Sequence, residues 1–290
     1  MDDRFTMRRM TRADLDTAVE WAAAEGWNPG LGDATAFWAA DPGGFFVGEL
    51  DGELVASISI VRYADRRSFL GFYIVRPDQR GGGFGRRLWD FARREVADAV
   101  NGTGLDGVID QVEAYRRSGF VLAHRNVRYV ARNPANAPAP AGSSAPVGLE
   151  PFTPADLADL VDYDAGVFGC RRPEFLEAWL AEDGSNALVA REAGRITGYG
   201  AVRPATEGYR VNPLFAETTD VAASLLDALL ATVPAGEPVA VDVPGVNDDA
   251  VRLVTERSMT PAFETARMYA GDVPDTDWRR VFGVTSFELG

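Results

Sequence analysis

The chain of 290 residues contains no lysine, and all 29 of its basic residues are arginine. The absence of lysine excludes Schiff-base chemistry, pyridoxal phosphate enzymes and the phosphate-binding lysine of P-loop proteins. A single histidine, His124, and a single cysteine, Cys170, stand in different halves of the chain. These counts exclude an intrachain disulfide and a multi-histidine site, so we expect no metal. The two residues do not by themselves exclude a Cys–His nucleophile, but packed, structural roles for both are the favoured interpretation.

Long hydrophobic runs are also absent. No apolar segment is long enough to span a bilayer, and the first ten residues lack the apolar core of a signal peptide. With so little cysteine, this predicts a cytoplasmic protein that has no membrane partner. The formal net charge of -14 argues against nucleic acid as a partner. It suits a cationic ligand such as an amine, but an acidic surface that only maintains solubility is the favoured interpretation.

The length favours two domains, because single hydrophobic cores stop growing below this size. Residues 133–146 read NPANAPAPAGSSAP and show no apolar period, as is typical of a semi-stiff linker. We therefore predict a domain at residues 1–132, a linker at 133–146 and a second domain at 147–290.

Apolar periodicity predicts helices and strands in alternation in the first domain. An Asp51-Gly52 turn indicates a hairpin, and the strand that follows it is apolar enough to be central in a sheet. The expected helices are residues 11–25, 85–96 and 111–118, and the expected strands are 44–50, 53–63, 68–75, 105–109 and the closing strands within 120–131.

The second domain repeats this order, which suggests an internal duplication. The expected helices are 154–165, 173–181, 220–233 and 248–257, and the expected strands are 186–192, 195–203, 209–214, 238–243 and 264–270. Residues 282–289 are apolar enough to complete a sheet as a strand.

The segment most informative about chemistry is residues 69–95, FLGFYIVRPDQRGGGFGRRLWDFARRE. A central strand ends at Val75, and the glycine-rich run from Arg80 to Gly85 then opens a helix. Such glycines, with the helix N-terminus, form a cradle for an anion such as pyrophosphate. The run is not a G-x-G-x-x-G dinucleotide motif, because Arg86 stands where the last glycine should be. Taken alone, a glycine-rich turn is more often only a tight connection.

The run fits the R-x-x-G-x-G pattern of the GCN5-related N-acetyltransferases, the GNAT superfamily. Residues 111–120, QVEAYRRSGF, resemble that family's later signature, a helix that carries Tyr115 and is followed by Gly119-Phe120; Val108 replaces the usual asparagine. The resemblance implies a mixed α/β (α+β) fold with two tandem GNAT-like domains, each a mixed, largely antiparallel sheet flanked by helices. It also implies an acetyl-CoA site in the first domain.

By the same resemblance, acetyl-CoA binds along the central strand and the glycine loop. The expected contacts are Tyr73, Ile74, Val75, Arg80, Gly81, Gly82, Gly83, Phe84 and Gly85. Backbone N–H groups near Val75 are the expected oxyanion donors. Tyr115 stands where many GNAT enzymes place the general acid that protonates the leaving thiolate; its alternative is an aromatic side chain packed on a helix.

The sequence leaves the general base open. Residues 24–31, AEGWNPGL, correspond to the loop that lines the acceptor site in GNAT folds. Glu25 is the first choice for a base or amine-recognising carboxylate, with Trp27 and Asn28 beside it as substrate contacts; a solvated carboxylate at a helix end is the alternative. Asp106 is the second choice, and a water relay is a further one.

The second domain is expected to keep the GNAT shape without its cofactor loop. The residues in place of the glycines, 211–217, read VNPLFAE, where proline removes a donor and bulky side chains close the turn. The chain carries the segment EGWNPG, then Tyr163-Asp164 and Phe168-Gly169 with Arg172, and the terminal FGVTSFELG. In these it resembles a subset of bacterial two-domain acetyltransferases in which the second domain packs on the first and completes the acceptor pocket. Asp164 and Arg172 are then candidate substrate contacts, with an internal ion pair as the alternative.

These features predict an N-acetyltransferase that moves an acetyl group from acetyl-CoA directly to a primary amine of a small molecule. The alternative is a module that binds acetyl-CoA as a sensor without turnover. The glycine spacing disfavours a nicotinamide-dependent oxidoreductase. We expect a monomer or homodimer, while the acceptor amine and the use of other acyl groups stay open.

Overall fold

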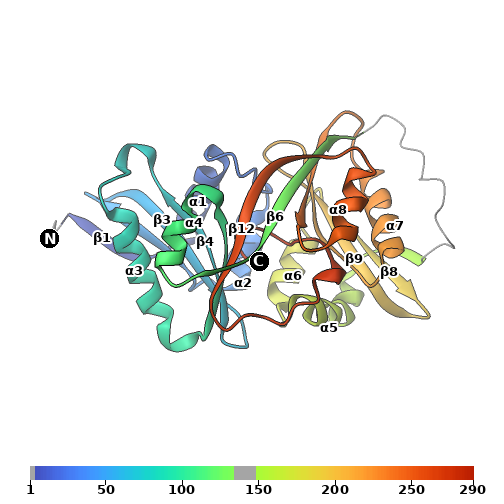
Figure 1. Ribbon diagram of the computed structural model, residues 1–290, viewed down its shortest axis with the longest axis horizontal. Coiled ribbons are helices and arrows are strands. Elements are labelled where there is room, and N and C mark those ends of the chain that lie inside the picture. The colour runs from blue at the N-terminus through green and yellow to red at the C-terminus, as the bar shows by residue number, and fades with distance from the viewer. Residues whose placement is uncertain (1–3, 134–147) are drawn as a thin grey trace.

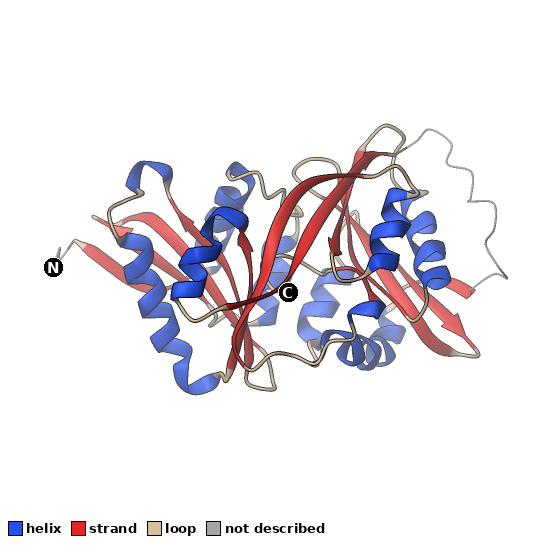
Figure 2. Ribbon diagram, in the orientation of Figure 1, coloured by secondary structure: helices blue, strands red, loops and turns tan. Residues whose placement is uncertain are grey.

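A computed structural model of the protein describes residues 4–133 and 148–290 (Figure 1). The predicted linker, apart from Asn133, lies outside the described residues. Two lobes of strands and helices lie side by side, and two long strands cross the middle of the molecule (Figure 2). Residues 4–133 are called the first half below, and residues 148–290 the second half.

The first half contains the helices and strands that its sequence predicts, together with strand β1 and helix α2, which the sequence does not predict. Its elements are β1 (Phe5–Arg9), α1 (Arg12–Ala24), α2 (Asp33–Ala40), β2 (Phe45–Leu50), β3 (Glu53–Arg62), β4 (Arg67–Val75), α3 (Phe84–Val96), β5 (Gly102–Val108), α4 (Val112–Arg117) and β6 (Val121–Arg132). A capping box of Thr11 and Asp14 starts α1, since each side chain accepts from the other residue's amide. The β2–β3 hairpin turns where Asp51 and Gly52 both adopt positive φ.

The second half repeats the order of the first and adds a short strand at its end. Its elements are β7 (Gly148–Pro151), α5 (Leu157–Phe168), α6 (Pro173–Leu180), β8 (Asn186–Glu192), β9 (Arg195–Pro204), β10 (Tyr209–Ala216), α7 (Thr219–Leu230), β11 (Pro238–Pro244), α8 (Asp248–Thr255), β12 (Thr260–Gly271) and β13 (Val281–Gly283). Thr218 and Asn247 cap α7 and α8 with their side chains.

The two halves exchange their last long strands. The sheet order is β1-β2-β3-β4-β5-β12-β6-β11-β10-β9-β8-β7, with β13 paired to β10. Strand β6 of the first half pairs antiparallel with β11 of the second, and β12 of the second half pairs antiparallel with β5 of the first. Strands β6 and β12 also pair with each other in the middle of the molecule (Figure 1). The predicted boundary therefore separates two repeats in the sequence but not two sheets in space.

The halves also share a hydrophobic core on one face of this sheet. Phe37 of α2 and Phe72 of β4 belong to the same buried cluster as Trp179 of α6 and Phe215 of β10. The rings of Phe37 and Trp179 stack with centroids 5.8 Å apart. Because this cluster contains large side chains from both halves, neither half can bury its apolar surface alone.

The segment after β13, residues 284–290, is buried throughout and runs from the second half to the first. At its start, the Thr285 carbonyl accepts a bond from the Asn212 side chain of β10 (2.7 Å). At its end, the Leu289 carbonyl accepts from the Tyr63 hydroxyl of the first half (2.6 Å). The apolar end that the sequence assigns to a strand is thus a strand only at residues 281–283.

Candidate active site

A cleft opens where two central strands of the first half separate. Strands β4 and β5 are parallel and pair only over residues 67–70 and 102–105. Just beyond, Phe72 adopts a φ of 47° and the register between β4 and β3 shifts, which is the geometry of a β-bulge. The cleft between the diverging strands has a volume of about 330 Å³ and is lined by residues of both halves.

The glycine-rich loop lies between the end of β4 and the start of α3. Gly81 and Gly83 have φ of 83° and 79°, in the left-handed region that favours glycine, and the space beside each is open. Gly83 is the N-cap of α3, and the first N–H groups of a helix have no partner within it. These features fit an anion such as the diphosphate of acetyl-CoA at this helix N-terminus.

Arg80 and Glu25 lie together at the edge of the cleft. The Arg80 Nε donates to the Val75 carbonyl (2.9 Å), and the Arg80 guanidinium forms an ion pair with the Glu25 carboxylate. Glu25 is the C-cap of α1, so this pair connects the first helix with the end of β4. The carboxylate that the sequence favours as a base is therefore engaged with Arg80 of the glycine-rich loop.

Tyr115 projects from α4 into an aromatic group that borders the cleft. Its ring stacks on Trp89 and meets Phe120 edge-on, with centroids 6.0 and 6.5 Å apart. Burial raises the pKa of the Tyr115 phenol to about 12, so the hydroxyl stays protonated at neutral pH. A protonated phenol that borders the cleft is compatible with the predicted acid role, and the packing is also what the structural alternative expects.

The second half supplies one wall of the cleft. Phe263 and Thr265 come from β12, and Phe287 and Glu288 from the segment after β13; Trp27 borders the same space from the first half. The Arg128 guanidinium lies over the Phe287 ring, 5.2 Å from its centroid. The cleft beside β4 therefore combines aromatic walls with a carboxylate.

Glu288 is the residue that sequence reasoning missed. It is 4% exposed, borders the cleft, and its Oε2 atom has no hydrogen-bond partner among the described residues. Burial raises the pKa of the Glu288 carboxyl to about 7. The available signal was a lone acidic residue within the apolar run at residues 281–289, since such a residue is rarely buried without a function.

The cleft brings together eight of the residues that the sequence selects. They are Glu25, Trp27, Tyr73, Ile74, Val75, Arg80, Asp106 and Tyr115. The carboxylate of Asp106 is already engaged in hydrogen bonds. It accepts from Asn126 (2.8 Å), from Thr265 (3.3 Å) and from Arg267. That arrangement holds β12 against β5 and favours a structural task for Asp106.

Three other predicted substrate contacts lie outside the cleft lining. Asn28 joins the halves: its side chain donates to the Glu207 carbonyl (3.0 Å) and accepts from the Glu207 amide (2.7 Å). Asp164 and Arg172 form a buried, bidentate ion pair with bonds of 2.8 and 2.9 Å. Arg172 also donates to the Thr285 hydroxyl (2.9 Å). This geometry is that of the internal ion pair, the alternative that the sequence left open.

The corresponding opening in the second half is filled by the chain itself. Strands β10 and β11 pair in parallel only over residues 209–211 and 239–241. Beyond that point β13 pairs with Leu214 and Phe215 of β10, and the Val284 amide donates to the Asp242 carbonyl of β11 (2.8 Å). A strand thus occupies the place that the first half leaves open, which supports the expected lack of a cofactor site there.

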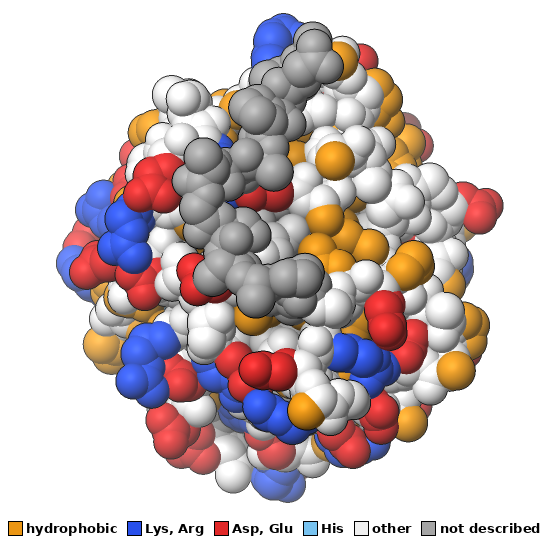
Figure 3. Space-filling model, turned by 90° about the vertical axis from the view of Figure 1, so that its right-hand side faces the viewer, with side chains coloured by type: hydrophobic (Ala, Val, Ile, Leu, Met, Phe, Trp, Pro, Cys, Tyr) orange, Lys and Arg blue, Asp and Glu red, His pale blue; other side chains and the backbone are white. Residues whose placement is uncertain are grey.

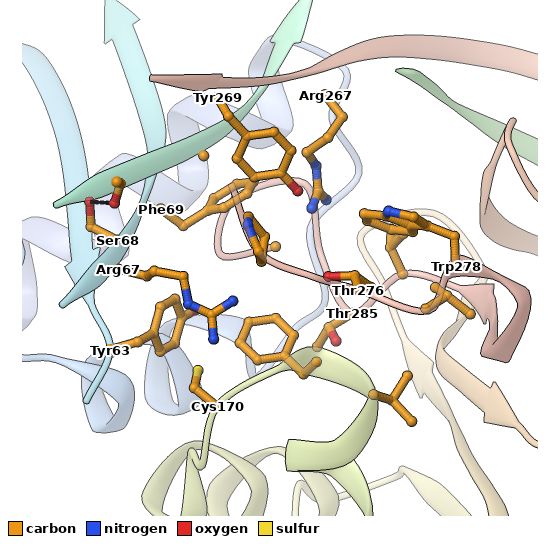
Figure 4. Close-up of a pocket in the computed structure, with 18 of the residues that line it drawn as sticks. Tyr63, Arg67, Ser68, Phe69, Cys170, Arg267, Tyr269, Thr276, Trp278 and Thr285 are labelled. Carbon is orange, nitrogen blue, oxygen red and sulfur yellow. Dashed lines mark hydrogen bonds between the residues drawn. The ribbon is translucent and has the colours of Figure 1, made fainter. Parts of the chain in front are cut away.

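A second, smaller cavity of about 60 Å³ lies where the halves meet (Figure 4). Aromatic side chains border it, among them Tyr63, Phe69 and Trp278, and Cys170 lies at its edge. Burial raises the pKa of the Cys170 thiol to about 12. His124 packs against Trp278, and mainly burial lowers the pKa of its imidazole to about 3. A protonated thiol and a neutral imidazole lack the charges of an activated Cys–His pair.

Two surface features bear on partners. No helix among the described residues is long and apolar enough to cross a membrane. On the face of the second half shown in Figure 3, acidic and basic side chains are interspersed and form no single charged field.

Comparison with known proteins agrees with this architecture. The family model described as "Acetyltransferase (GNAT) family" matches residues 10–120, and one described as "Acetyltransferase (GNAT) domain" matches residues 160–283. A protein named holothin acyltransferase, from a Pseudoalteromonas species, is 33% identical over 99% of this chain and 95% of its own.

Two solved structures share the fold. A Pyrococcus horikoshii protein assigned to the acetyltransferases superposes with a TM-score of 0.81 at 21% identity, covering 99% of this chain and 96% of its own. A tandem GNAT protein from the clavulanic acid biosynthesis pathway gives 0.64 at 13% identity and covers 93% and 99%. The chain belongs to the GNAT superfamily. Within it, the protein is a two-domain acyltransferase.

Proposed function

We propose that the protein transfers an acetyl group from acetyl-CoA directly to the primary amine of a small molecule. The observation that carries this proposal is the opening between β4 and β5, which lies beside the glycine cradle at the start of α3. An opening of this kind exposes strand edges to the pantetheine arm, while the helix N-terminus favours the diphosphate. Bound acetyl-CoA would supply an activated acyl group as a thioester.

The chain's own residues provide the remaining groups that amide formation requires. Backbone N–H groups near Val75, in the part of β4 that does not pair with β5, would stabilise negative charge on a carbonyl oxygen. We assign the protonation of the leaving sulfur to the Tyr115 hydroxyl, because it borders the cleft and carries its proton at neutral pH. Direct transfer needs no enzyme nucleophile, in agreement with the protonated state of Cys170.

The cleft walls favour an acceptor with an apolar or aromatic body. Trp27, Phe263 and Phe287 border the space, and Glu288 is a carboxylate without a partner beside them. A single unpartnered carboxylate among aromatic rings suits one amino group on a flat or apolar skeleton, whereas a polyamine would bury several charges with only one free counter-charge. The holothin acyltransferase supports acyl transfer as the reaction of this two-domain arrangement.

The first test measures thermal unfolding with acetyl-CoA, CoA and NAD, followed by thiol release with benzylamine, tryptamine, glucosamine and spermidine. We expect stabilisation by acetyl-CoA and CoA but not by NAD, and faster thiol release with the apolar monoamines than with spermidine. Gly83→Asp places a side chain and a negative charge in the cradle at a φ of 79°, so acetyl-CoA binding should be lost in calorimetry.

The matched control is Gly52→Asp, because Gly52 also has positive φ but lies in the β2–β3 turn. It should lower stability and leave the affinity for acetyl-CoA unchanged. Wild-type affinity in Gly83→Asp would place the site elsewhere. Stabilisation by acetyl-CoA without thiol release for any amine would favour the sensor that the sequence left as an alternative.

A further inference from the structure

Glu288 differs from the other carboxylates that border the cleft, because it has no cation or donor of its own. Asp106 accepts from three side chains, and Glu25 is paired with Arg80. The Oε2 atom of Glu288 has no hydrogen-bond partner among the described residues, and no ion pair to it forms there. A buried, unpartnered carboxylate costs stability, so its retention in a cleft points to a task there.

The charged groups around Glu288 compensate its negative charge only in part. Arg210 of β10 and Arg128 of β6 face it, but both guanidiniums are bound to Asp242 of β11. Asp33 of α2 adds a further negative charge and is paired with Arg203. Burial outweighs the two arginines, which are shared with Asp242, and raises the pKa of the Glu288 carboxyl to about 7. A base works best when its pKa lies near the working pH.

The backbone of Glu288 is fixed beside the strand that borders the cleft. It lies so close to Gly71 of β4 that a Cβ added there would fall 2.3 Å from the Glu288 carbonyl oxygen. Gly71 immediately precedes the bulge at Phe72, where β4 leaves β5. The next residue is also held, because the Leu289 amide donates to the Ser286 hydroxyl (2.9 Å). Glu288 is thus placed on a constrained turn at the point where the strands part.

We propose that Glu288, carried by the end of the second half, is the general base of the site in the first half. The Glu288 carboxylate accepts the proton that the acceptor amine loses as its nitrogen bonds to the acetyl carbon. As the carbon–sulfur bond breaks, the sulfur leaves with the electron pair and takes a proton from Tyr115. Glu288 then releases its proton to solvent and Tyr115 regains one, so the net products are an amide and a thiol. This assignment rests on the proposed function.

The test is Glu288→Gln, which keeps the size of the side chain and removes its basicity. With the fastest amine of the panel, or with water as acceptor if no amine accelerates thiol release, we expect kcat to fall by about 10² to 10⁴. Affinity for acetyl-CoA should stay within about twofold in calorimetry, an order-of-magnitude allowance for side chains outside the cradle. The wild-type kcat/KM should rise with pH through a limb near 7 that the variant lacks.

A second readout does not depend on turnover. Because the pKa of Glu288 is raised in the folded state, its ionisation opposes folding, and the contribution of Glu288 to wild-type stability should be lost as pH rises from 5 to 8. Glu288→Gln has no such group, so its Tm should rise relative to wild type over that range. The matched control is Glu264→Gln on β12, where a half-buried glutamate pairs with Arg125; it should change neither the rate nor the pH profile.

The outcomes separate this assignment from the proposed function. Suppose that the Glu288→Gln protein binds acetyl-CoA and acetylates the amine with the rate and the pH limb of the wild type. Glu288 is then not the base, and the proposed function still stands. Absence of acetyl-CoA binding and thiol release in the wild type would overturn both. If Glu288→Gln fails to fold, Glu288→Asp retains a carboxylate that reaches less far. It should keep the limb near pH 7 and lower kcat, and an unchanged kcat would contradict the assignment.

Discussion

Tyr115 and Glu288 border the same cleft, and both lose most of their hydration there. Burial raises the pKa of the Tyr115 phenol to about 12, which keeps the phenol protonated, and raises that of the Glu288 carboxyl to about 7, which leaves it partly ionised at neutral pH. At the scale of single residues, one physical cause therefore makes Glu288 a stronger base and holds Tyr115 in its protonated form, while it weakens Tyr115 as an acid.

Tyr115→Phe tests the acid at this scale. The substitution removes only the hydroxyl, so the ring packing against Trp89 and Phe120 should remain. We expect kcat for thiol release to fall by about 100-fold, with acetyl-CoA affinity nearly unchanged. Tyr129→Phe, which removes a hydroxyl from a buried tyrosine in the core of the second half, is the control and should leave kcat unaltered. An unaltered kcat in Tyr115→Phe would reduce Tyr115 to a packed aromatic residue.

The sequence predicts a functional role for Tyr115 but not for Glu288, and the reason is physical. Tyr115 and the loop from Arg80 to Gly85 lie in contiguous motifs, whose function depends on local geometry. Glu288 acquires its surroundings only because the chain after β13 passes from one half to the other. A lone acidic residue in an apolar run signals an unusual site, but nothing local says which cleft it enters.

At the scale of elements, the two repeats have equivalent openings between parallel strands, and only one of these openings is filled by the chain. In the second half β13 fills the space between β10 and β11, while in the first half the matching space between β4 and β5 stays open. Strand β13, which closes the opening of the second half, continues directly into the turn that carries Glu288. The chain from β13 onward thus fills the opening of the second repeat and supplies a carboxylate, Glu288, to the cleft of the first.

Gly71→Ala tests the contact between β4 and this turn. A methyl group at Gly71 would overlap the backbone of Glu288, and both partners are backbone atoms that cannot rotate away. We expect a loss of about 1 to 3 kcal/mol in the free energy of unfolding, measured with urea. The kcat should also fall, because the displaced turn carries Glu288.

The control for Gly71→Ala is Gly166→Ala on α5, where the nearest atom to an added Cβ is 3.9 Å away. Alanine favours the helix, so this variant should gain up to about 1 kcal/mol and keep its kcat. Equal stability and equal kcat for Gly71→Ala and wild type would show that the turn adjusts, and that its close contact with β4 does not position Glu288.

At the scale of the whole molecule, the repeats are predictable and their exchange is not. Apolar alternation predicts β6 and β12 as closing strands, since it specifies which side chains face the core. It does not specify a neighbour, and an antiparallel edge accepts any strand of matching pattern. The choice is made by contacts far apart in sequence, such as Arg128 with Asp242 and Arg267 with Asp106, which pair across the exchanged strands.

The exchange predicts that neither repeat folds alone. Residues 1–132 would lack β12 beside β5 and residues 148–290 would lack β6 beside β11, so each would expose an unpaired edge and part of the shared core. We expect each fragment to be unfolded or aggregated by circular dichroism and size exclusion, and the two to associate when co-expressed. A full chain cut at a protease site inserted within residues 134–147 is the control and should keep one cooperative unfolding transition and its acetyl-CoA affinity. A fragment 1–132 that unfolds cooperatively and binds acetyl-CoA would show that β12 is dispensable to the first sheet, and the second half would then act only through Glu288 and the aromatic wall.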